Sequence, residues 1–307
     1  MTCGCVCRSG NTMYDTVLVP TDGSDHAERA GAHAAFLARA FDASIHLLNV
    51  VDLQAAAGPM NAGGVDEAYV ERLESEGEAT IGALEPVVDG LSVETAVVRG
   101  RPSEAILDYA AEHDVDLLAM GTHGRTGLER YIAGSVVEHV VRHATVPVLT
   151  TRAVETSTVD DGYDEIVIPT DGSEPSTAAV EHGLAIAERA DARVHAINVV
   201  NVATLASGPD HTAPTELLEE LTARGERVTE EIATAAAERG LDATTTVREG
   251  FPARDILDYV EANDADLVAM GTAGRSGLNR FLLGSTTERV VRHSPVPVCA
   301  VNARDTE

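Results

Sequence analysis

Short runs of consecutive apolar residues alternate along this chain with longer segments whose apolar residues recur every three or four positions. In the first half the short runs predict buried β-strands over 16–20, 44–51, 93–98, 115–120 and 146–150. The segments with helical spacing cover 27–41, 66–88, 103–112 and 135–143, and Ser103 is placed to cap the third of them. Strands that alternate with helices predict parallel pairing through right-handed crossovers, and hence a doubly wound α/β fold.

The second half repeats this pattern. VPTDGS at 19–24 returns as IPTDGS at 168–173, AMGT at 119–122 returns at 269–272, and VVRH at 140–143 returns at 290–293. The matches keep their order at a nearly constant offset, which indicates a duplication. We therefore predict two tandem five-stranded parallel-sheet domains of Rossmann-like type over 13–150 and 163–302, joined by a polar linker at 151–162.

Residues 1–12 precede the first repeat and contain Cys3, Cys5 and Cys7. The stretch has no apolar core, so it does not read as a secretory signal. A zinc site would usually pair a C-x2–4-C motif with a second pair of ligands, and the only other cysteine is Cys299. We expect a disordered leader, or a start assigned too early, since Met13 opens the first strand directly; a metal or redox role is the alternative.

The charge of the chain is strongly negative. Its formal net charge is −28, its pI is about 4.6, and all 22 basic residues are arginine. Such a field repels nucleic acids and anionic membranes, and no apolar run is long enough to span a bilayer. Molar salt would screen the self-repulsion, because the Debye length there is about 3 Å. We therefore favour a halophilic cytoplasm over a merely acidic mesophilic protein, and expect salt to support both folding and anion binding.

A glycine-rich pattern follows the fourth predicted strand of each half. Gly121-x2-Gly124-x9-Gly134-Ser135 and Gly271-x2-Gly274-x9-Gly284-Ser285 both fit G-x2-G-x9-G-[ST]. Glycine lets backbone N–H groups approach phosphate oxygens closely, and a helix N-terminus favours an anion. The serines could instead cap their helices, because a glutamate follows each of them three residues later. The pattern predicts a phosphate site in each half.

Asp22 and Asp171 lie just after the first strand of each half. Open α/β sheets bind ligands at the carboxyl ends of their strands, where a carboxylate can accept hydrogen bonds from ribose hydroxyls. An Asp-Gly turn is the structural alternative. The loops of the two copies differ at one position, where His123 in the first corresponds to Ala273 in the second. Arg125 and Arg275 follow a loop glycine in each copy, and each could equally neutralise phosphate or form a surface salt bridge.

With these residues in view, both halves resemble the universal stress protein family, in its ATP-binding branch, from VPTDGS through the final Val-Pro-Val strand. The resemblance implies that the loop glycines and serine hold phosphates, the aspartate holds ribose, and backbone after the second strand meets adenine. It assigns to the nucleotide sites Pro20, Thr21, Asp22, Val50, Met120, Gly121, Gly124, Gly134, Ser135 and Val136 in the first half, and Pro169, Thr170, Asp171, Val199, Met270, Gly271, Gly274, Gly284, Ser285 and Thr286 in the second.

The expected function is that of an ATP-binding stress or signalling protein rather than a rapid enzyme. No P-loop can be formed without lysine, and no Ser-His-Asp or paired-carboxylate set can be assigned. ATP, or another adenine nucleotide, would act with magnesium as a conformational ligand. Slow ATP hydrolysis or autophosphorylation, and an interaction protein with vestigial sites, are the alternatives. The resemblance also implies an intrachain pseudo-dimer through 146–148 and 296–298, with further homo-oligomers open.

Overall fold

The computed structural model describes residues 13–57, 66–123, 135–159, 162–202, 215–273 and 283–302. The predicted leader at 1–12 lies outside them. Described elements of the first half are β1 (Thr16–Pro20), α1 (Asp25–Phe41), β2 (Ser44–Val51), α2 (Leu53–Ala57), α3 (Glu67–Gly82), β3 (Val93–Arg99), α4 (Pro102–Glu112), β4 (Leu117–Gly121), α5 (Ser135–His143) and β5 (Val148–Thr151).

The second half follows the same order. Its described elements are β6 (Glu165–Pro169), α6 (Glu174–Ala190), β7 (Arg193–Asn201), α8 (Thr215–Glu238), β8 (Ala243–Gly250), α9 (Pro252–Ala262), β9 (Leu267–Gly271), α10 (Ser285–His293) and β10 (Val298–Val301).

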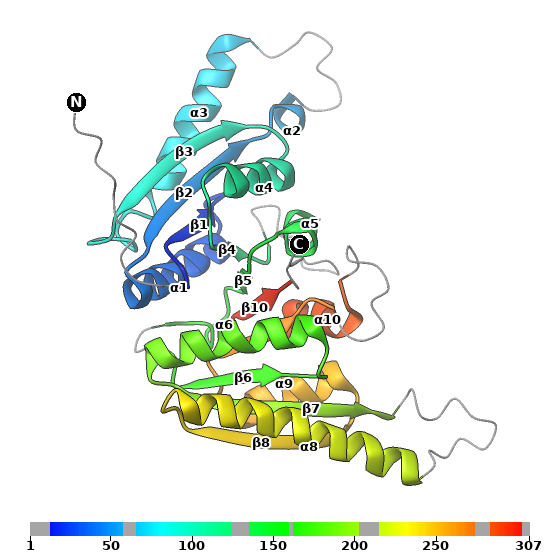
Figure 1. Ribbon diagram of the computed structural model, residues 1–307. Helices are drawn as coiled ribbons and strands as arrows, with labels where there is room; N and C mark the ends of the chain where they lie inside the picture. Colours follow the sequence, from blue (N-terminus) through cyan, green and yellow to red (C-terminus); the bar gives the residue numbers. More distant parts are fainter. Residues whose placement is uncertain are drawn as a thin grey trace, which may run out of the picture.

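The two halves share one continuous sheet. Its strand order is β3-β2-β1-β4-β5-β10-β9-β6-β7-β8, and every pair within a half is parallel. This confirms two doubly wound five-stranded units. Among the described strands, the only antiparallel pair is that of β5 with β10, in which Leu149 lies opposite Cys299. These two strands lie where the halves meet in Figure 1. The expected intrachain pairing is confirmed, but its ladder begins at Val148 and Val298, after each Val-Pro, because proline has no N–H to donate.

Several boundaries differ from the sequence-based expectation. Helix α4, which was predicted to begin at Ser103, begins at Pro102. Its N-cap residue is Arg101, which makes no side-chain capping hydrogen bond, so Ser103 is not the N-cap. Proline suits this first helical position because its missing N–H would have no partner there. The helix predicted to run to residue 88 ends at Gly82 and is followed by turns, while Asp66 caps its start by accepting from the Tyr69 N–H at 2.8 Å.

Helices cover both faces of the sheet (Figure 1). One face carries α1, α3, α6 and α8, whose buried residues form a single apolar core that extends across both halves from Tyr14 to Val301. The other face carries two separate cores, one under α4 and α5 and one under α9 and α10. The halves are therefore joined by a shared core on one face as well as by the β5–β10 ladder.

A reciprocal pair of hydrogen bonds crosses between the halves. The Tyr14 hydroxyl lies 2.8 Å from Nδ1 of His182, and the Tyr163 hydroxyl lies 2.9 Å from Nδ1 of His33. Tyr14 and Tyr163 occupy equivalent positions in the repeat, as do the two histidines. Each half thus supplies a tyrosine to the other half's helix, which is the reciprocity expected of a two-fold interface.

The predicted linker is itself part of this interface. Thr151 belongs to β5, and both Thr151 and Ser157 are fully buried. The Arg152 guanidinium donates to the carbonyls of His293 and Ser294 at the end of α10. The equivalent Asn302 donates to the Val141 and Ala144 carbonyls at the end of α5. These side chains satisfy carbonyls that a helix end leaves without partners.

We expect His33 to make the joined fold sensitive to acid. Burial is the main cause that lowers the pKa of His33 from 6.5 to about 4, opposed by its hydrogen bond to the Ser157 carbonyl and assisted by nearby Arg29. The contribution of neutral His33 to the free energy of unfolding is fully present above pH 6.5. It is lost as the pH falls toward 4, because His33 takes up its proton at a higher pH in the unfolded chain than in the folded one. The loss amounts to about 3 kcal/mol. Denaturant unfolding from pH 7 to 4 should show it, and His33→Gln should remove that part of the slope. An unchanged slope in the variant would contradict the assignment.

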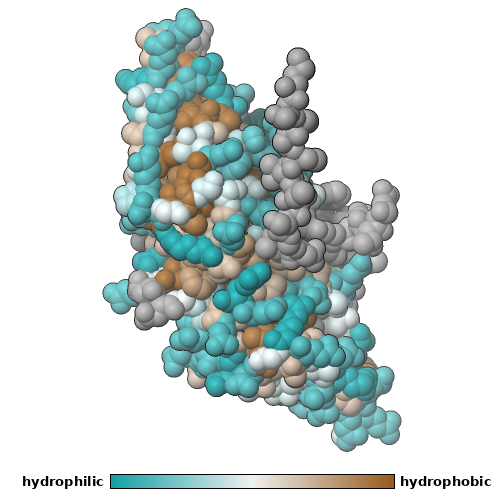
Figure 2. Space-filling view, turned by 60° about the vertical axis from the view of Figure 1, so that its left-hand side comes forward, coloured by the Kyte–Doolittle hydropathy of each residue, from teal (hydrophilic) through white to brown (hydrophobic). Residues whose placement is uncertain are grey.

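Hydrophilic residues cover most of the described surface seen in Figure 2, apart from a strip of hydrophobic residues in its upper half. No helix among the described residues is long and apolar enough to cross a lipid bilayer.

Candidate functional site

Each half contains a cleft at the carboxyl ends of its central strands. The first has a volume of about 480 Å³ and is lined from β1, β2, β4, α3, α4 and α5. The second has a volume of about 460 Å³ and is lined from the equivalent elements β6, β7, β9, α8, α9 and α10. Both volumes fall in the range of small-ligand sites, and the carboxyl edge is where open α/β sheets bind ligands.

Most residues assigned from the sequence lie in these clefts. The first is lined by Pro20, Thr21, Asp22, Val50, Met120, Gly121 and Val136. The second is lined by Pro169, Thr170, Asp171, Val199, Met270, Gly271, Gly284, Ser285 and Thr286. Gly124, Gly134 and Gly274 lie outside the described residues, as does the Ser135 side chain. The structure therefore brings together the strand-end residues that the sequence separates by about a hundred positions.

Asp22 and Asp171 combine a turn with a place in the cleft. Oδ1 of Asp22 accepts from the Ser24 N–H at 3.1 Å, and Oδ1 of Asp171 accepts from the Ser173 N–H at 3.0 Å. The serines in turn cap α1 and α6. The predicted Asp-Gly turn is thus present and uses one oxygen of each carboxylate. The same turn holds each aspartate at the cleft wall.

The first glycine of each motif is required by packing. A Cβ on Gly121 would lie 2.6 Å from the main-chain carbon of His26, and one on Gly271 would lie 2.6 Å from that of Pro175. Main chain cannot move aside as a flexible side chain can, so β4 and β9 approach the starts of α1 and α6 only because these positions lack a Cβ. This close approach places the ends of β4 and β9 beside the starts of α1 and α6.

The start of α10 faces the second cleft. Its N-cap is Gly284, which makes no side-chain cap hydrogen bond, and Ser285 is the first helical residue. The capping-box alternative is therefore wrong for Ser285; Glu288 instead pairs with Arg292 at 2.7 Å. Gly284, Ser285 and Thr286 all line the cleft, so the first N–H groups of this nine-residue helix lie at its wall. That is the arrangement that binds anions at helix N-termini.

Sequence reasoning missed an asparagine at each site. The Asn49 amide donates to the Thr21 carbonyl at 2.8 Å, and the Asn198 amide donates to the Thr170 carbonyl at 2.6 Å. Both asparagines line their clefts, and each ties the second strand to the loop that carries the aspartate. Their recurrence in LNVV at 48–51 and INVV at 197–200 was a usable signal. Further missed lining residues recur in both halves, among them Pro102 with Pro252, Ile106 with Ile256 and Gly77 with Gly225.

The clefts differ in their cationic groups. His123 lines the first cleft, its ring lies 5.2 Å from the ring of His26, and Arg152 is close enough to both to influence them. Burial, and then the Arg152 charge, lower the pKa of His123. Burial, followed by His123 and Arg152, lowers the pKa of His26. The equivalent positions in the second half are Pro175, Ala273 and Asn302. The second cleft is instead lined by Arg224, whereas the first is lined by Glu76 at the corresponding place.

Both halves of the chain match the model of one protein family. The family model described as "Universal stress protein family" matches residues 13–152 and again 162–302. A universal stress protein of Methanocaldococcus jannaschii is 40% identical over 149 residues, which cover 48% of this chain and 87% of that protein. One of Mycolicibacterium smegmatis is 27% identical over 302 residues, which cover 94% of this chain and 97% of that protein.

A crystal structure of a universal stress protein from Archaeoglobus fulgidus has the same fold along almost the whole chain. It aligns with a TM-score of 0.71 at 23% identity, and the match covers 96% of this chain and 100% of that chain. At this identity the likeness concerns the fold alone. The family model, in contrast, matches both halves almost end to end, in register with the duplicated strands and clefts described above. The chain belongs to the universal stress protein family, with two copies of its domain in tandem.

Proposed function

We propose that each half of this chain binds one adenine nucleotide, with ATP as the first candidate, and that the nucleotide acts as a conformational ligand. The observation that carries the proposal is the repetition of one cleft. The two clefts have nearly equal volume and place an aspartate, a strand-end methionine-glycine pair and a helix N-terminus at equivalent points. A duplication whose copies had no shared ligand would have no need to keep all of these together.

The proposed pose follows from the types of group along each cleft. Apolar Val50 and Val199 lie where an adenine ring would contact backbone and methyl groups. Asp22 and Asp171 lie in the turns at the cleft wall, where the second carboxylate oxygen of each could accept hydrogen bonds from ribose hydroxyls. The phosphates would then reach the starts of α5 and α10, whose N–H groups favour an anion.

Magnesium would enter with the phosphates. Mg²⁺ keeps several waters and is usually held by one or two carboxylates together with substrate phosphates. A metal bound mainly to the nucleotide would offset part of the repulsion between ATP and a chain whose net charge is −28. Asp22 and Asp171 are the cleft carboxylates common to both halves, and each already uses one oxygen in its turn.

The proposal is tested by occupancy. Nucleotide released by denaturing the purified full chain should be an adenine nucleotide by mass spectrometry, and titration of stripped protein with Mg-ATP should show two sites. Affinity should be kept or increased between about 0.1 and about 3 M KCl, because the Debye length shrinks from about 10 Å to 3 Å or less and repulsion is screened. The two sites should differ in affinity, since His123 lines the first cleft together with Asp52 and Glu76, while Arg224 lines the second. Absence of binding, or a single site, would contradict the proposal.

A further inference from the structure

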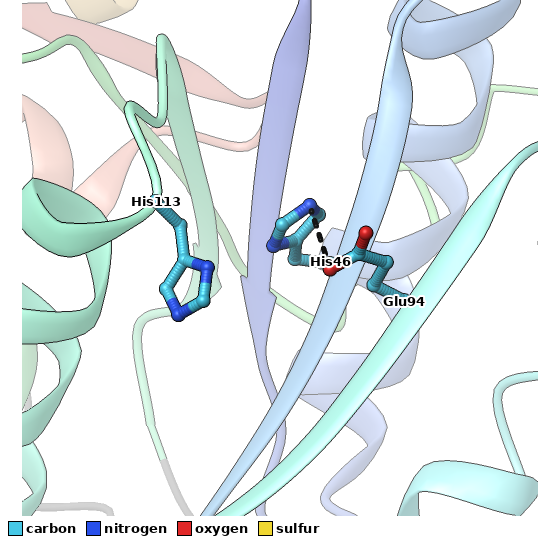
Figure 3. A group of neighbouring side chains, drawn as sticks. All are labelled: His46, Glu94 and His113. Atoms are coloured by element: carbon cyan, nitrogen blue, oxygen red, sulfur yellow. Dashed lines mark ion pairs between the residues drawn. The ribbon is translucent and has the colours of Figure 1, made fainter. Parts of the chain in front are cut away.

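A group of three metal-ligating side chains lies at the end of the sheet opposite the first cleft. His46 is near the start of β2, Glu94 is its partner on β3, and His113 follows the end of α4. One ligand atom from each lies within 4.8 Å of the others. Figure 3 shows the three side chains converging from two strands and a helix end. Among the described residues, no other set of three such ligands comes together in this way.

Tyr109 holds the two histidines in position. Its hydroxyl lies 3.1 Å from Nδ1 of His46, and its ring stacks on that of His113 with 3.9 Å between centroids. The bond to Nδ1 leaves Nε2 of His46 directed at Glu94, whose carboxylate oxygen is 3.7 Å away. Metal-binding histidines commonly use their second nitrogen in this way, because the outer partner fixes ring orientation and tautomer.

The second half has a histidine at the position of His46, but it has no carboxylate or histidine at the positions of Glu94 and His113. Its equivalent histidine, His195, makes the same bond to a tyrosine, with Nδ1 3.0 Å from the Tyr259 hydroxyl. Its Nε2, however, is 2.6 Å from the carboxylate of Glu165. The equivalents of Glu94 and His113 are Thr244 and Asn263. In the second copy, Nε2 of the histidine is therefore already occupied by a carboxylate of its own domain.

The first half lacks that internal partner. Thr16 occupies the position of Glu165, so no carboxylate on β1 reaches Nε2 of His46. Two exposed ligands, Glu94 and His113, stand at the positions where the second half has a hydroxyl and an amide. The three differences occur together, at Thr16, Glu94 and His113. Together they replace the close contact between His195 and Glu165 by a more open arrangement of two imidazoles and one carboxylate.

We propose that His46, Glu94 and His113 bind a divalent transition metal ion of the zinc class. Two nitrogens and one oxygen are a donor set that zinc accepts, with water in the fourth position of a tetrahedral site. The ligand bonds of such a site are about 2.0–2.2 Å long, so the three donors must close in from their present spacing. Glu94 and His113 can do so because both are exposed at the surface, while His46 is fixed in the core.

The ion would connect three elements at one end of the domain. It would join β2 and the edge strand β3 to the end of α4, whose first residue, Pro102, lines the cleft at the opposite end of the helix. The site shares no residue with the nucleotide cleft. Its test is therefore independent of whether nucleotide binds.

The experiment is a zinc titration of the full chain, with Cys3, Cys5 and Cys7 changed to serine so that the cysteine run cannot bind the metal. We expect one zinc per chain and a higher melting temperature with zinc. His113→Asn and Glu94→Thr install the residues of the second half. Outer-shell partners alone are worth about 10–100-fold in metal affinity, so loss of a direct ligand should weaken binding by at least about 100-fold. Without zinc, both variants should melt as the parent does, because the substituted side chains are exposed.

A second histidine pair supplies the matched control. His139 and His143 stack on α5 with their ring centroids 4.1 Å apart, one helical turn from each other. His139→Asn should leave zinc stoichiometry and affinity unchanged if the proposed site holds the ion. Zinc binding that survives His113→Asn, binding lost in His139→Asn, or no binding by the parent would each overturn the proposal.

Discussion

Replacing Gly284 with aspartate is expected to empty the nucleotide site of the second half and to leave the first site occupied. The new carboxylate would stand at the N-cap of α10, beside the N–H groups proposed to receive phosphate. A like charge about 4 Å away costs roughly 4 kcal/mol at the effective dielectric of a partly solvated site, so affinity should fall by at least about 100-fold. Titration calorimetry should then count one Mg-ATP per chain in place of two.

This substitution separates binding from folding. The backbone of Gly284 has φ −62° and ψ 139°, which any residue can adopt, and aspartate is a slightly better N-cap than glycine. The melting temperature without nucleotide should therefore stay level or rise. Gly284→Ser is the matched control, because it supplies a cap without a charge and should keep two sites. Two sites of normal affinity in the aspartate variant would show that phosphate does not lie at this helix end.

Leu149→Asp is expected to prevent the two halves from forming one fold. Leu149 sits opposite Cys299 in the β5–β10 ladder, and both side chains are fully buried. A carboxylate there has no partner, and burying it costs several kcal/mol. Domains are stable by only about 5–15 kcal/mol, so most of that stability would be lost. Denaturant unfolding in concentrated salt should show a large shift of the midpoint, or no cooperative transition.

The comparison variant is Leu149→Met, which keeps the volume and apolar character of the side chain. Such exchanges usually cost less than about 1.5 kcal/mol, so this variant should unfold close to the parent. If the aspartate variant unfolds at the same denaturant concentration as the parent, the contact of Leu149 with Cys299 contributes nothing to stability, either through the β5–β10 ladder or through the shared core to which both residues belong.

The sequence by itself determined the repeated plan and much of the candidate site. The bounds of β1 and β2 were predicted to the residue, because both strands are mostly apolar runs that end at a turn signal or a polar residue. The duplicated motifs placed Asp22 and Asp171 at strand ends, and the rule for parallel sheets brought them to the same edge as Met120 and Met270. Such features are local in sequence, so periodicity and repetition are enough to find them.

Only the tertiary structure decided how the pieces are held. The β5–β10 register, the exchange of Tyr14 and Tyr163 between halves and the burial of Ser157 depend on surfaces far apart in the chain. The helix start at Pro102 displaced Ser103 because proline fits the first turn without needing a partner for an N–H. Asn49 escaped notice because its partner, the Thr21 carbonyl, lies in the loop after β1, far from it in sequence. Gly121 was expected to line the nucleotide site, and its missing Cβ is also required by the main chain of α1, a contact that no local pattern encodes.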